Sequence, residues 1–263
     1  MQKRFCTRLW EHAIVRFKNK VAVVTGATNG IGERVAERLY AEGACVVIAS
    51  RSAALVEKKA RALSHDRQRV LGIACDVADP ASVRQMIEQA VAHFGRIDLA
   101  VNSAGITGDS GRPIAEQSID NWNQVMATTL SGVFHCMKYE LPQLVAAAGG
   151  AIVNLSAVNG LVGIAGLGPY TVAKHGVIGL TQTAALEYAC DGIRINAVAP
   201  GYVDTPRMHE FPEAVRHGFA EAHPLQRMAT VDEVASFILF LLSGDAGFCT
   251  GGIFPIDGGY LAR

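Results

Sequence analysis

The sequence has no excess of either charge. Its 263 residues include 24 Lys and Arg against 24 Asp and Glu, so the formal net charge at pH 7 is zero. Binding of nucleic acid by electrostatics needs a basic face, so this balance argues against nucleic acid as a partner. Long apolar runs are also absent. The stretch Phe237–Leu242 near the end of the chain is far too short to cross a bilayer, and we expect no membrane partner.

Paired cysteines are missing as well. The six cysteines are scattered, and none forms a C-x-x-C pair. This argues against a zinc or redox motif and favours small buried thiols in a reducing compartment. No apolar stretch follows the first basic residues, so no signal peptide is predicted and the expected location is cytoplasmic.

The first 19 residues differ from the rest of the chain. They carry five Lys and Arg against a single acid, Glu11. A packing arm, a frayed tail and a start codon set too early all fit this segment. A transit peptide fits less well because the segment has no serine. We therefore leave residues 1–19 unassigned.

From residue 20 onward, short apolar runs alternate with helical patterns. Strands that are apolar throughout are typical of a parallel sheet buried on both faces, and the alternation of strands with helices predicts a doubly wound α/β sheet. No repeat or linker divides residues 20–263, which we interpret as one domain. The strands are predicted at Val21–Thr25, Cys45–Ser50, Val70–Cys75, Leu99–Asn102, Ala151–Leu155, Arg194–Ala199 and Phe254–Asp257.

A glycine-rich loop joins the first predicted strand to the first predicted helix. Gly26, Gly30 and Gly32 are spaced as G-x-x-x-G-x-G, one residue wider than the commonest dinucleotide fingerprint. Glycine lets the backbone approach a pyrophosphate closely, and the helix N-terminus supplies free N–H groups and a positive dipole end. A glycine cluster alone could be a simple tight turn, but its position between strand and helix predicts a dinucleotide site.

Several further motifs, together with this loop, resemble the classical short-chain dehydrogenase/reductase family over about 240 residues. They are Asp76 after the third strand, N-S-A-G at 102–105, Tyr170 and Lys174 in Y-x-x-x-K, N-x-x-x-P-G at 196–201, Thr205, and D-G-G at 257–259. The resemblance implies a Rossmann-type sheet in three αβα layers and a nicotinamide cofactor. It also implies a homo-oligomer, a tetramer or dimer, whose interface uses the long helices before Gly132 and after Pro169.

The loop and the resemblance together assign a set of residues to the cofactor. They are Gly26, Thr28, Asn29, Gly30, Ile31, Gly32, Ser50, Arg51, Asp76, Val77, Asn102, Ala104, Gly105, Tyr170, Lys174, Pro200, Gly201, Val203 and Thr205. The end of the second strand discriminates between the cofactors, since an acid there would favour NAD. Ser50 and Arg51 stand there instead, and an arginine can pair with the 2′-phosphate of NADP. We therefore predict NADP(H), with NAD(H) as the alternative. Asn29 weakens this prediction because many NADP-preferring relatives have a basic residue there, and Arg51 could also be a solvated charge.

Tyr170 and Lys174 are the predicted catalytic pair. They lie four residues apart on a helix and so share one face. A nearby ammonium and a positive nicotinamide would lower the tyrosine pKa from its usual value of about 10. Tyr170 would then give or take the hydroxyl proton. Lys174 would activate it and hydrogen-bond the nicotinamide ribose, as the resemblance implies.

Two other catalytic positions depart from the family pattern. The family serine, thirteen residues before the tyrosine, falls on Ala157, and the family asparagine falls on Thr129. Ser156 is adjacent, but neighbouring positions of a strand point to opposite faces. Losing one donor to the substrate oxygen typically costs about 10²–10³ in rate.

Three explanations remain open for these departures. Ser156 or a water replaces the missing hydroxyl, the chain is a weak or specialised reductase, or it is a catalytically reduced dinucleotide-binding protein that acts as a sensor or scaffold. The intact pair Tyr170 and Lys174 favours an oxidoreductase that interconverts a carbonyl and a secondary alcohol. Ala157 and Thr129 favour the binding protein.

A variable segment at about residues 203–224 is expected to cover the substrate. Its three histidines lack metal-ligand spacing, so no metal is predicted. Its moderately apolar composition suggests a neutral small-molecule substrate. Arg207 and Arg216 are its only candidates for binding an anionic one.

Overall fold

The computed structural model describes residues 15–64 and 68–262. Its main sheet has seven strands, all parallel, in the order β3-β2-β1-β4-β5-β6-β9. This confirms the predicted doubly wound α/β fold. The strands are β1 (Val21–Thr25), β2 (Cys45–Ser50), β3 (Val70–Ala74), β4 (Leu99–Asn102), β5 (Gly150–Leu155), β6 (Ile193–Pro200) and β9 (Ile253–Ile256).

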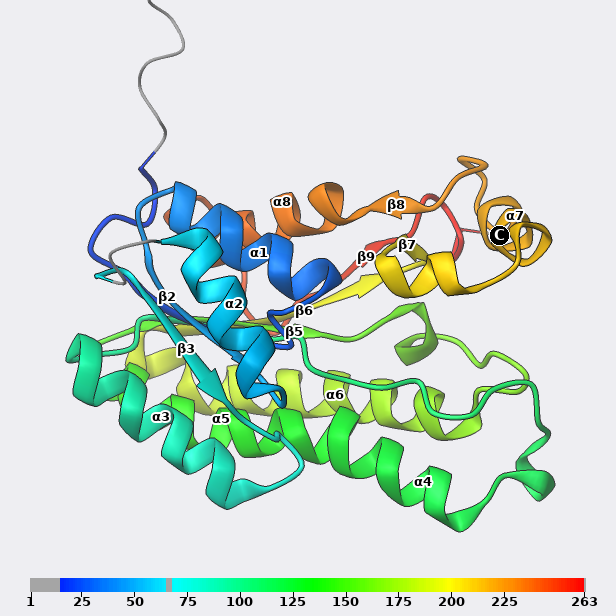
Figure 1. The fold of residues 1–263 in the computed structure, drawn as a ribbon, viewed down its shortest axis with the longest axis horizontal. Coiled ribbons are helices and arrows are strands. Elements are labelled where there is room, and N and C mark those ends of the chain that lie inside the picture. The colour runs from blue at the N-terminus through cyan, green and yellow to red at the C-terminus, as the bar shows by residue number, and fades with distance from the viewer. Residues whose placement is uncertain (1–14, 65–67, 263) are drawn as a thin grey trace, which may run out of the picture.

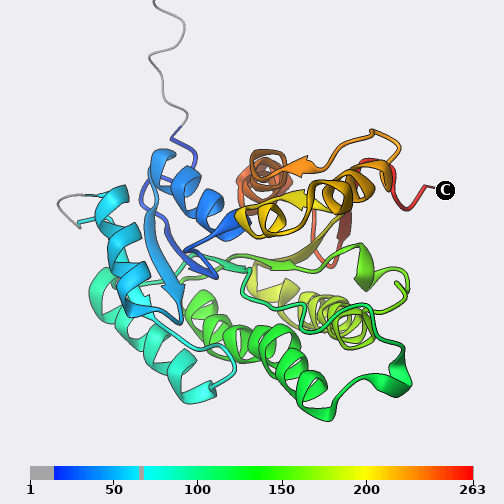
Figure 2. The same cartoon turned by 45° about the vertical axis from the view of Figure 1, so that its right-hand side comes forward.

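Helices cover both faces of this sheet and form the outer two of three layers (Figure 1). One apolar core lies between the sheet and α1, α2 and α8, and a second lies between the sheet and α3, α5 and α6. Figure 2 shows the sheet between the two helical layers. The helices are α1 (Gly30–Ala41), α2 (Ala53–Leu63), α3 (Pro80–Phe94), α4 (Ile119–Val125), α5 (Gly132–Ala146), α6 (Gly168–Tyr188), α7 (Glu213–Glu221) and α8 (Val231–Leu242).

Local sequence signals set several helix starts. The Asp79 side chain accepts a hydrogen bond from the Ala81 N–H at the start of α3, with Pro80 as the first helical residue. Thr230 and Glu233 form the capping box of α8, each accepting from the other's backbone N–H.

Residues 126–131 join α4 to α5 through a π-helical turn, which the sequence did not predict. Such turns are rare and often occur at functional sites. Residues 15–19 lie against the end of α1, where Phe17 is buried and Arg16 forms an ion pair with Glu42. The remainder of the unassigned segment, residues 1–14, lies outside the described residues.

The strand order places a ligand site at one edge of the sheet. β1 has β2 on one side and β4 on the other, so the chain direction across the sheet reverses there. In open α/β sheets ligands bind beyond the carboxyl ends of the strands at such a switch point. Beyond the carboxyl end of β6, the chain forms the short strands β7 (Val203–Asp204) and β8 (Ala229–Thr230) with α7 between them (Figure 1).

No helix formed by the described residues combines the length and the hydropathy that crossing a membrane would require.

Candidate active site

The glycine loop is packed so tightly that side chains would not fit at two of its glycines. Gly26 has φ +66°, and a Cβ there would lie 3.0 Å from the backbone of Ala104. A Cβ on Gly32 would lie 2.5 Å from the carbonyl oxygen of Gly26. The loop after β1 thus lies directly on the loop after β4, and both positions require glycine.

The N-terminus of α1 is open for a ligand. Asn29 is its N-cap residue, with extended backbone and no side-chain hydrogen bond to the first turn. The first N–H groups of a helix lack intrahelical partners, and with the dipole they form an anion site. A Cβ on Gly30 would lie 3.2 Å from Thr205, so the loop after β6 reaches this helix end. The cradle therefore fits the pyrophosphate of a dinucleotide.

Thr25 ties the two loops together. Its Oγ1 accepts hydrogen bonds from the backbone N–H groups of Ser103 at 3.2 Å and Ala104 at 3.3 Å. At the next residue, a Cβ on Gly105 would lie 3.8 Å from Nζ of Lys174. The structure thus brings the glycine loop, the N-S-A-G segment and the predicted catalytic lysine together.

Four further predicted cofactor residues lie at or just after the carboxyl ends of β2 and β3. Arg51 is exposed and forms no hydrogen bond or ion pair with another described residue, and Ser50 before it is half-buried. Asp76 accepts a hydrogen bond from the Ala78 N–H at 3.0 Å, and Val77 is buried. Arg51 is thus free to pair with a phosphate.

Tyr170 and Lys174 lie one turn apart on α6, with Nζ of Lys174 5.5 Å from the centre of the Tyr170 ring. Lys174 is 4% exposed, and Nζ donates to the Leu155 carbonyl oxygen at 2.5 Å. Burial lowers the pKa of Lys174 to about 8. Burial raises the pKa of Tyr170 to about 12, and the positive charge of Arg207 opposes this shift.

These values define what the pair does at neutral pH. The Tyr170 hydroxyl stays protonated because its pKa of about 12 lies far above 7. Lys174 is mostly protonated, since its pKa of about 8 lies above neutrality. The site therefore holds a protonated tyrosine with an ammonium group beside its ring. The sequence predicted that this ammonium would lower the Tyr170 pKa, but in the structure burial raises it instead.

Ser156 and Ala157 follow β5, and their side chains have different surroundings. The Ser156 hydroxyl is buried and donates to the Lys174 carbonyl oxygen at 3.0 Å, beside Gly160. The Ser156 hydroxyl is thus hydrogen-bonded to the backbone of α6. Ala157 has extended backbone, is 8% exposed, and offers no polar side-chain atom at the family's serine position.

Thr129 lies in the π-helical turn and is fully buried. Its hydroxyl donates to the Ile106 carbonyl oxygen at 2.8 Å and accepts from the Ile106 N–H at 2.9 Å. The one hydroxyl hydrogen is therefore used within the protein. Thr129 fixes the segment after Gly105 and has no hydrogen left to donate to a water.

The sequence reasoning missed a buried polar network beneath these loops. Asn102, the last residue of β4, donates to Glu140 of α5 and to Asn154 of β5, each at 3.0 Å. The available signal was an acid inside the apolar sequence of α5, since Met137 and Leu144 on the same helix are buried core residues. That pattern indicates a buried carboxyl group but does not identify its partners.

The segment over the substrate side is held by aromatic contacts. The rings of Tyr202 and Phe219 stack with centroids 4.4 Å apart. His223 is buried, and its Nε2 accepts from the Tyr202 N–H at 3.2 Å while Nδ1 donates to the Phe219 carbonyl.

The other two histidines of this segment, His209 and His217, contact the nearby acids Asp204 and Glu221. Within the described ranges no three His, Cys, Asp or Glu residues gather as a metal site.

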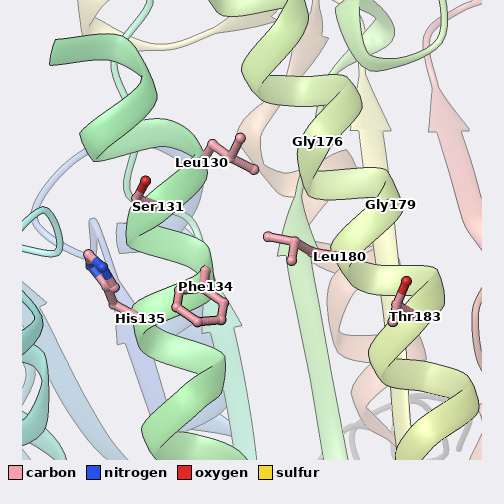
Figure 3. Close-up of a pocket in the computed structure, with 8 residues that line it drawn as sticks. All are labelled: Leu130, Ser131, Phe134, His135, Gly176, Gly179, Leu180 and Thr183. Carbon is pink, nitrogen blue, oxygen red and sulfur yellow. The ribbon is translucent and has the colours of Figure 1, made fainter. Parts of the chain in front are cut away.

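A separate groove lies on the outer surface between the helical segment of residues 126–146 and α6. Figure 3 shows Leu130 and Leu180 pointing across it toward the opposite helix. The groove is lined by residues that do not belong to the predicted site. These lining residues are Leu130, Ser131, Phe134, His135, Gly176, Gly179, Leu180 and Thr183.

Comparison with known proteins places this geometry in a family. The profile described as "Enoyl-(Acyl carrier protein) reductase" matches residues 26–261. The cyclohexanol dehydrogenase of Acinetobacter sp. (strain SE19) is 42% identical over 248 residues, which cover 94% of this chain and 97% of that protein. The cis-4-hydroxycyclohexanecarboxylate dehydrogenase of Sinomonas cyclohexanicum is 44% identical over 246 residues, covering 94% and 98%.

A solved structure agrees with these sequence matches. "ElxO with NADP Bound" superposes with a TM-score of 0.87 at 36% identity, and the match covers 93% of this chain and 99% of that one. The fold is therefore that of a nucleotide-binding oxidoreductase. The chain belongs to the short-chain dehydrogenase/reductase family.

Proposed function

We propose that this chain is an NAD(P)(H)-dependent oxidoreductase that interconverts a carbonyl compound and a secondary alcohol. Tyr170 is its acid/base and Lys174 its activator. The observation that carries the proposal is the position of the Lys174 ammonium beside both the Tyr170 ring and Gly105. Gly105 belongs to the loop on which the glycine-rich cradle is packed. One side of the site thus fits a dinucleotide, and the other supplies a proton.

The residues divide the work as follows. The first turn of α1, which includes Gly32, and Gly26 in the loop before it would hold the pyrophosphate. The nicotinamide, when bound, supplies or accepts the hydride. In reduction, Tyr170 donates its phenolic proton to the carbonyl oxygen, and the ammonium of Lys174 stabilises the phenolate that is left. In oxidation the tyrosine takes the proton, so it must first be deprotonated.

We propose that the missing serine slows this site without silencing it. Ala157 cannot donate to the substrate oxygen, and the Ser156 hydroxyl is bonded to Lys174. Tyr170 remains to donate a proton to that oxygen. The second candidate, a dinucleotide-binding sensor or scaffold, is favoured by the same absence of a donor at Ala157 and of a free hydroxyl hydrogen at Thr129.

For the cofactor we propose NADP(H) over NAD(H). Arg51 follows β2 and has no partner among the described residues, so its guanidinium is free to pair with a 2′-phosphate. A solved relative carries NADP, which supports this assignment. No acid stands at the end of β2 to repel that phosphate.

For the substrate we propose a small neutral cyclic alcohol and its ketone. The aromatic residues of the 203–224 segment favour an apolar ring, as does the similarity to a cyclohexanol dehydrogenase. The similarity to a dehydrogenase of a hydroxycyclohexanecarboxylate raises the alternative of an anionic substrate. In that case Arg207, whose charge acts on Tyr170, would bind the carboxylate.

A substrate panel tests the function and the substrate class together. Cyclohexanone, cyclohexanol and 4-hydroxycyclohexanecarboxylate would be supplied with each cofactor, and nicotinamide absorbance followed, for the native chain and for Arg207→Gln. We expect turnover of the neutral pair, with little change in Arg207→Gln. Turnover only of the carboxylate, lost in Arg207→Gln, would overturn the neutral substrate. Absence of turnover with all of them, despite cofactor binding, would favour the sensor or scaffold.

We also propose a homo-oligomer, a tetramer or dimer, assembled through α6 and the helical segment of residues 126–146, which extends to both sides of Gly132. The groove of Figure 3 is apolar, and Phe134 beside it is 48% exposed. A Cβ on Gly179 would meet nothing within 4 Å, so a partner helix could approach closely there. The cytoplasmic location stays a prediction.

A further inference from the structure

Glu140 of α5 is fully buried, and its carboxyl group has no positive partner in the described part of the chain. None of the ion pairs formed between described residues includes it. Its Oε2 accepts from Nδ2 of Asn102 at 3.0 Å. Among the residues that the structure describes, its Oε1 has no hydrogen-bond partner, and neither has Oδ1 of Asn102. Two buried oxygens on neighbouring side chains thus lack a donor, which is rare in folded proteins.

The side chains of Glu140 and Asn102 do not carry enough hydrogen atoms to satisfy all of their oxygens when Glu140 is ionised. The two amide hydrogens of Asn102 are both used, one on Glu140 and the other on Oδ1 of Asn154 at 3.0 Å. The two oxygens without a partner are Oε1 of Glu140 and Oδ1 of Asn102, and both can only accept hydrogen bonds when Glu140 is ionised. A single proton on Oε1 of Glu140 would donate to Oδ1 of Asn102. A carboxylic acid and a carboxamide would then form a ring closed by two hydrogen bonds.

The rest of the network fixes the orientation of Asn102. The Thr181 hydroxyl donates to the Val177 carbonyl at 2.7 Å and therefore accepts from Nδ2 of Asn154 at 2.9 Å. Oδ1 of Asn154 is left to accept from Asn102. If Asn102 were turned over, its oxygen would lie against Oε2 of Glu140, and two oxygens at that distance again need a proton between them.

The surroundings of Glu140 favour the neutral form. The titratable groups acting on it are the thiols of Cys136, one turn earlier on α5, and Cys75, after β3; burial raises the pKa of both. β4, β5 and α6 contribute the amides and the hydroxyl already described. Burial raises the pKa of Glu140 to about 7, against the effect of the Asn102 hydrogen bond. The buried residues of α3, which packs on α5, are apolar: Val83, Met86, Ile87 and Ala90.

We propose that Glu140 is a protonated carboxylic acid in the folded chain, paired with Asn102 in a two-hydrogen-bond ring, and that this ring positions the loop after β4 for the cofactor. Asn102 is the residue before the N–H groups that bond Thr25, and the same loop ends at Gly105 beside Lys174. Glu140 acts through Asn102 and is a positioning residue. Only the second half of the proposal rests on the proposed function.

Infrared spectroscopy tests the protonation directly on the native chain. Among the described residues, Glu140 is the carboxyl group with a raised pKa. With glutamate labelled by ¹³C at the carboxyl, we expect a protonated-acid carbonyl band at pH 6 that fades as pH rises through about 7. Glu140→Gln should lack the band, while Glu187→Gln, at an exposed position of α6, should keep it. No such band in the native chain at pH 6 would overturn the proposal.

Stability provides a second, independent readout. A raised folded-state pKa stabilises the fold below the unfolded-state value, and this contribution is lost as pH rises through the folded-state value. Relative to Glu140→Gln, whose amide can form the same ring, the native folded-to-unfolded ratio should fall about 70-fold between pH 5 and 8, given a shift from 4.5 to about 7. A constant ratio would overturn the proposal. If Glu140→Gln does not fold, the infrared titration of the native chain still shows whether Glu140 is protonated.

Cofactor affinity tests the positioning role. Fluorescence titration with NADPH should show Glu140→Gln equal to the native chain at pH 6, and a dissociation constant about tenfold higher for Glu140→Leu, which breaks the ring. Above pH 7 native binding should weaken and Glu140→Gln binding should not. Equal affinity in Glu140→Leu would overturn the positioning role. If the native chain binds no nicotinamide cofactor, the proposed function and the positioning role both fail, while the infrared and stability results still decide the protonation.

Discussion

The hydroxyl of Ser156 donates a hydrogen bond to the main-chain carbonyl of Lys174, 3.0 Å away. The serine that stands next to the family's catalytic position therefore bonds the backbone of the residue that activates Tyr170. This contact links the end of β5 to α6, and Ala157, the next residue, has no side-chain donor.

Restoring the missing donor should raise activity. Ala157→Ser places a hydroxyl where the resemblance expects one, and a single such donor is worth about 10²–10³ in rate. We expect the turnover rate to rise by one order of magnitude or more, measured by nicotinamide absorbance with saturating cofactor. Ala157→Cys, a similar size but a weak donor, is the control. An unchanged rate in Ala157→Ser would show that another group already fills this role.

Removing the Ser156 hydroxyl should affect stability before chemistry. The Lys174 carbonyl loses one buried hydrogen bond in Ser156→Ala, which costs about 1 kcal/mol of unfolding free energy. Denaturant unfolding measures this loss, and the turnover rate should stay within about threefold of the native rate. A loss of about two orders of magnitude in that rate, with unchanged stability, would instead make Ser156 a direct donor to the substrate.

Arg51 should decide the cofactor preference. Its guanidinium is exposed after β2 and has no partner among the described residues, so Arg51→Ala removes only the 2′-phosphate contact. We expect NADPH to bind about tenfold or more weakly, since charge-assisted contacts are worth about 1.5–3 kcal/mol, while NADH affinity stays constant. Arg61→Ala, on α2, serves as a control for surface charge. Equal losses for both cofactors would refute the assignment of Arg51.

The pH profile should report Lys174. Its pKa of about 8 means that the ammonium beside Tyr170 is lost as pH rises through that value. Carbonyl reduction should therefore slow above pH 8, with the turnover rate falling about tenfold per pH unit once the lysine is mostly neutral. NADPH affinity measured in parallel separates this effect from weaker cofactor binding. A turnover rate that stays flat to pH 10 would exclude a charged Lys174 from the chemical step.

The lowered pKa of Lys174 also predicts that the stability of the fold increases with pH, whereas the turnover rate decreases. A lysine whose folded-state pKa is lowered binds fewer protons when folded, so unfolding free energy rises with pH between about 8 and 10.5. Lys174→Met should lack this rise. Chemical denaturation of both chains at pH 7.5 and 10 measures it, and parallel curves for the two would contradict burial of a charged Lys174.

The groove between α5 and α6 should control assembly. Gly179→Arg adds a long charged side chain where the structure has open space, so the monomer should fold normally while a partner helix is excluded. Light scattering after gel filtration should show a smaller species than for the native chain. Gly218→Arg on α7, also open, is the matched control. An unchanged mass in Gly179→Arg would show that the interface lies elsewhere on the surface.

Much of the fold could be predicted because buried parallel strands are apolar on both faces. Strands β1, β2 and β4 have the predicted bounds, and those of β3, β5, β6 and β9 differ by one residue at one or both ends. Tyr170 and Lys174 lie on one helix as predicted, α6, which runs from Gly168 to Tyr188. The π-helical turn at 126–131 could not be predicted, since the hydrogen-bond pattern of such a turn leaves no mark on hydrophobic periodicity.

The site was predictable where residue type follows from local geometry. Gly26 and Gly32 are required by close backbone contacts, and Tyr170 with Lys174 by helical spacing. The pairing of Glu140 with Asn102 joins residues 38 positions apart, and only the packing of α5 on the sheet brings them together. The bond from Ser156 to Lys174 likewise depends on the tertiary contact between β5 and α6.

We propose above that Tyr170 performs the proton transfer of a working oxidoreductase. The most direct test compares the native chain with Tyr170→Phe in single-turnover reduction of a cyclic ketone by bound NADPH, with cofactor affinity measured on both. We expect native turnover, a loss of at least about 10³-fold in Tyr170→Phe, and equal affinities. Equal rates in both chains, or no native turnover even though NADPH binds, would contradict this proposal.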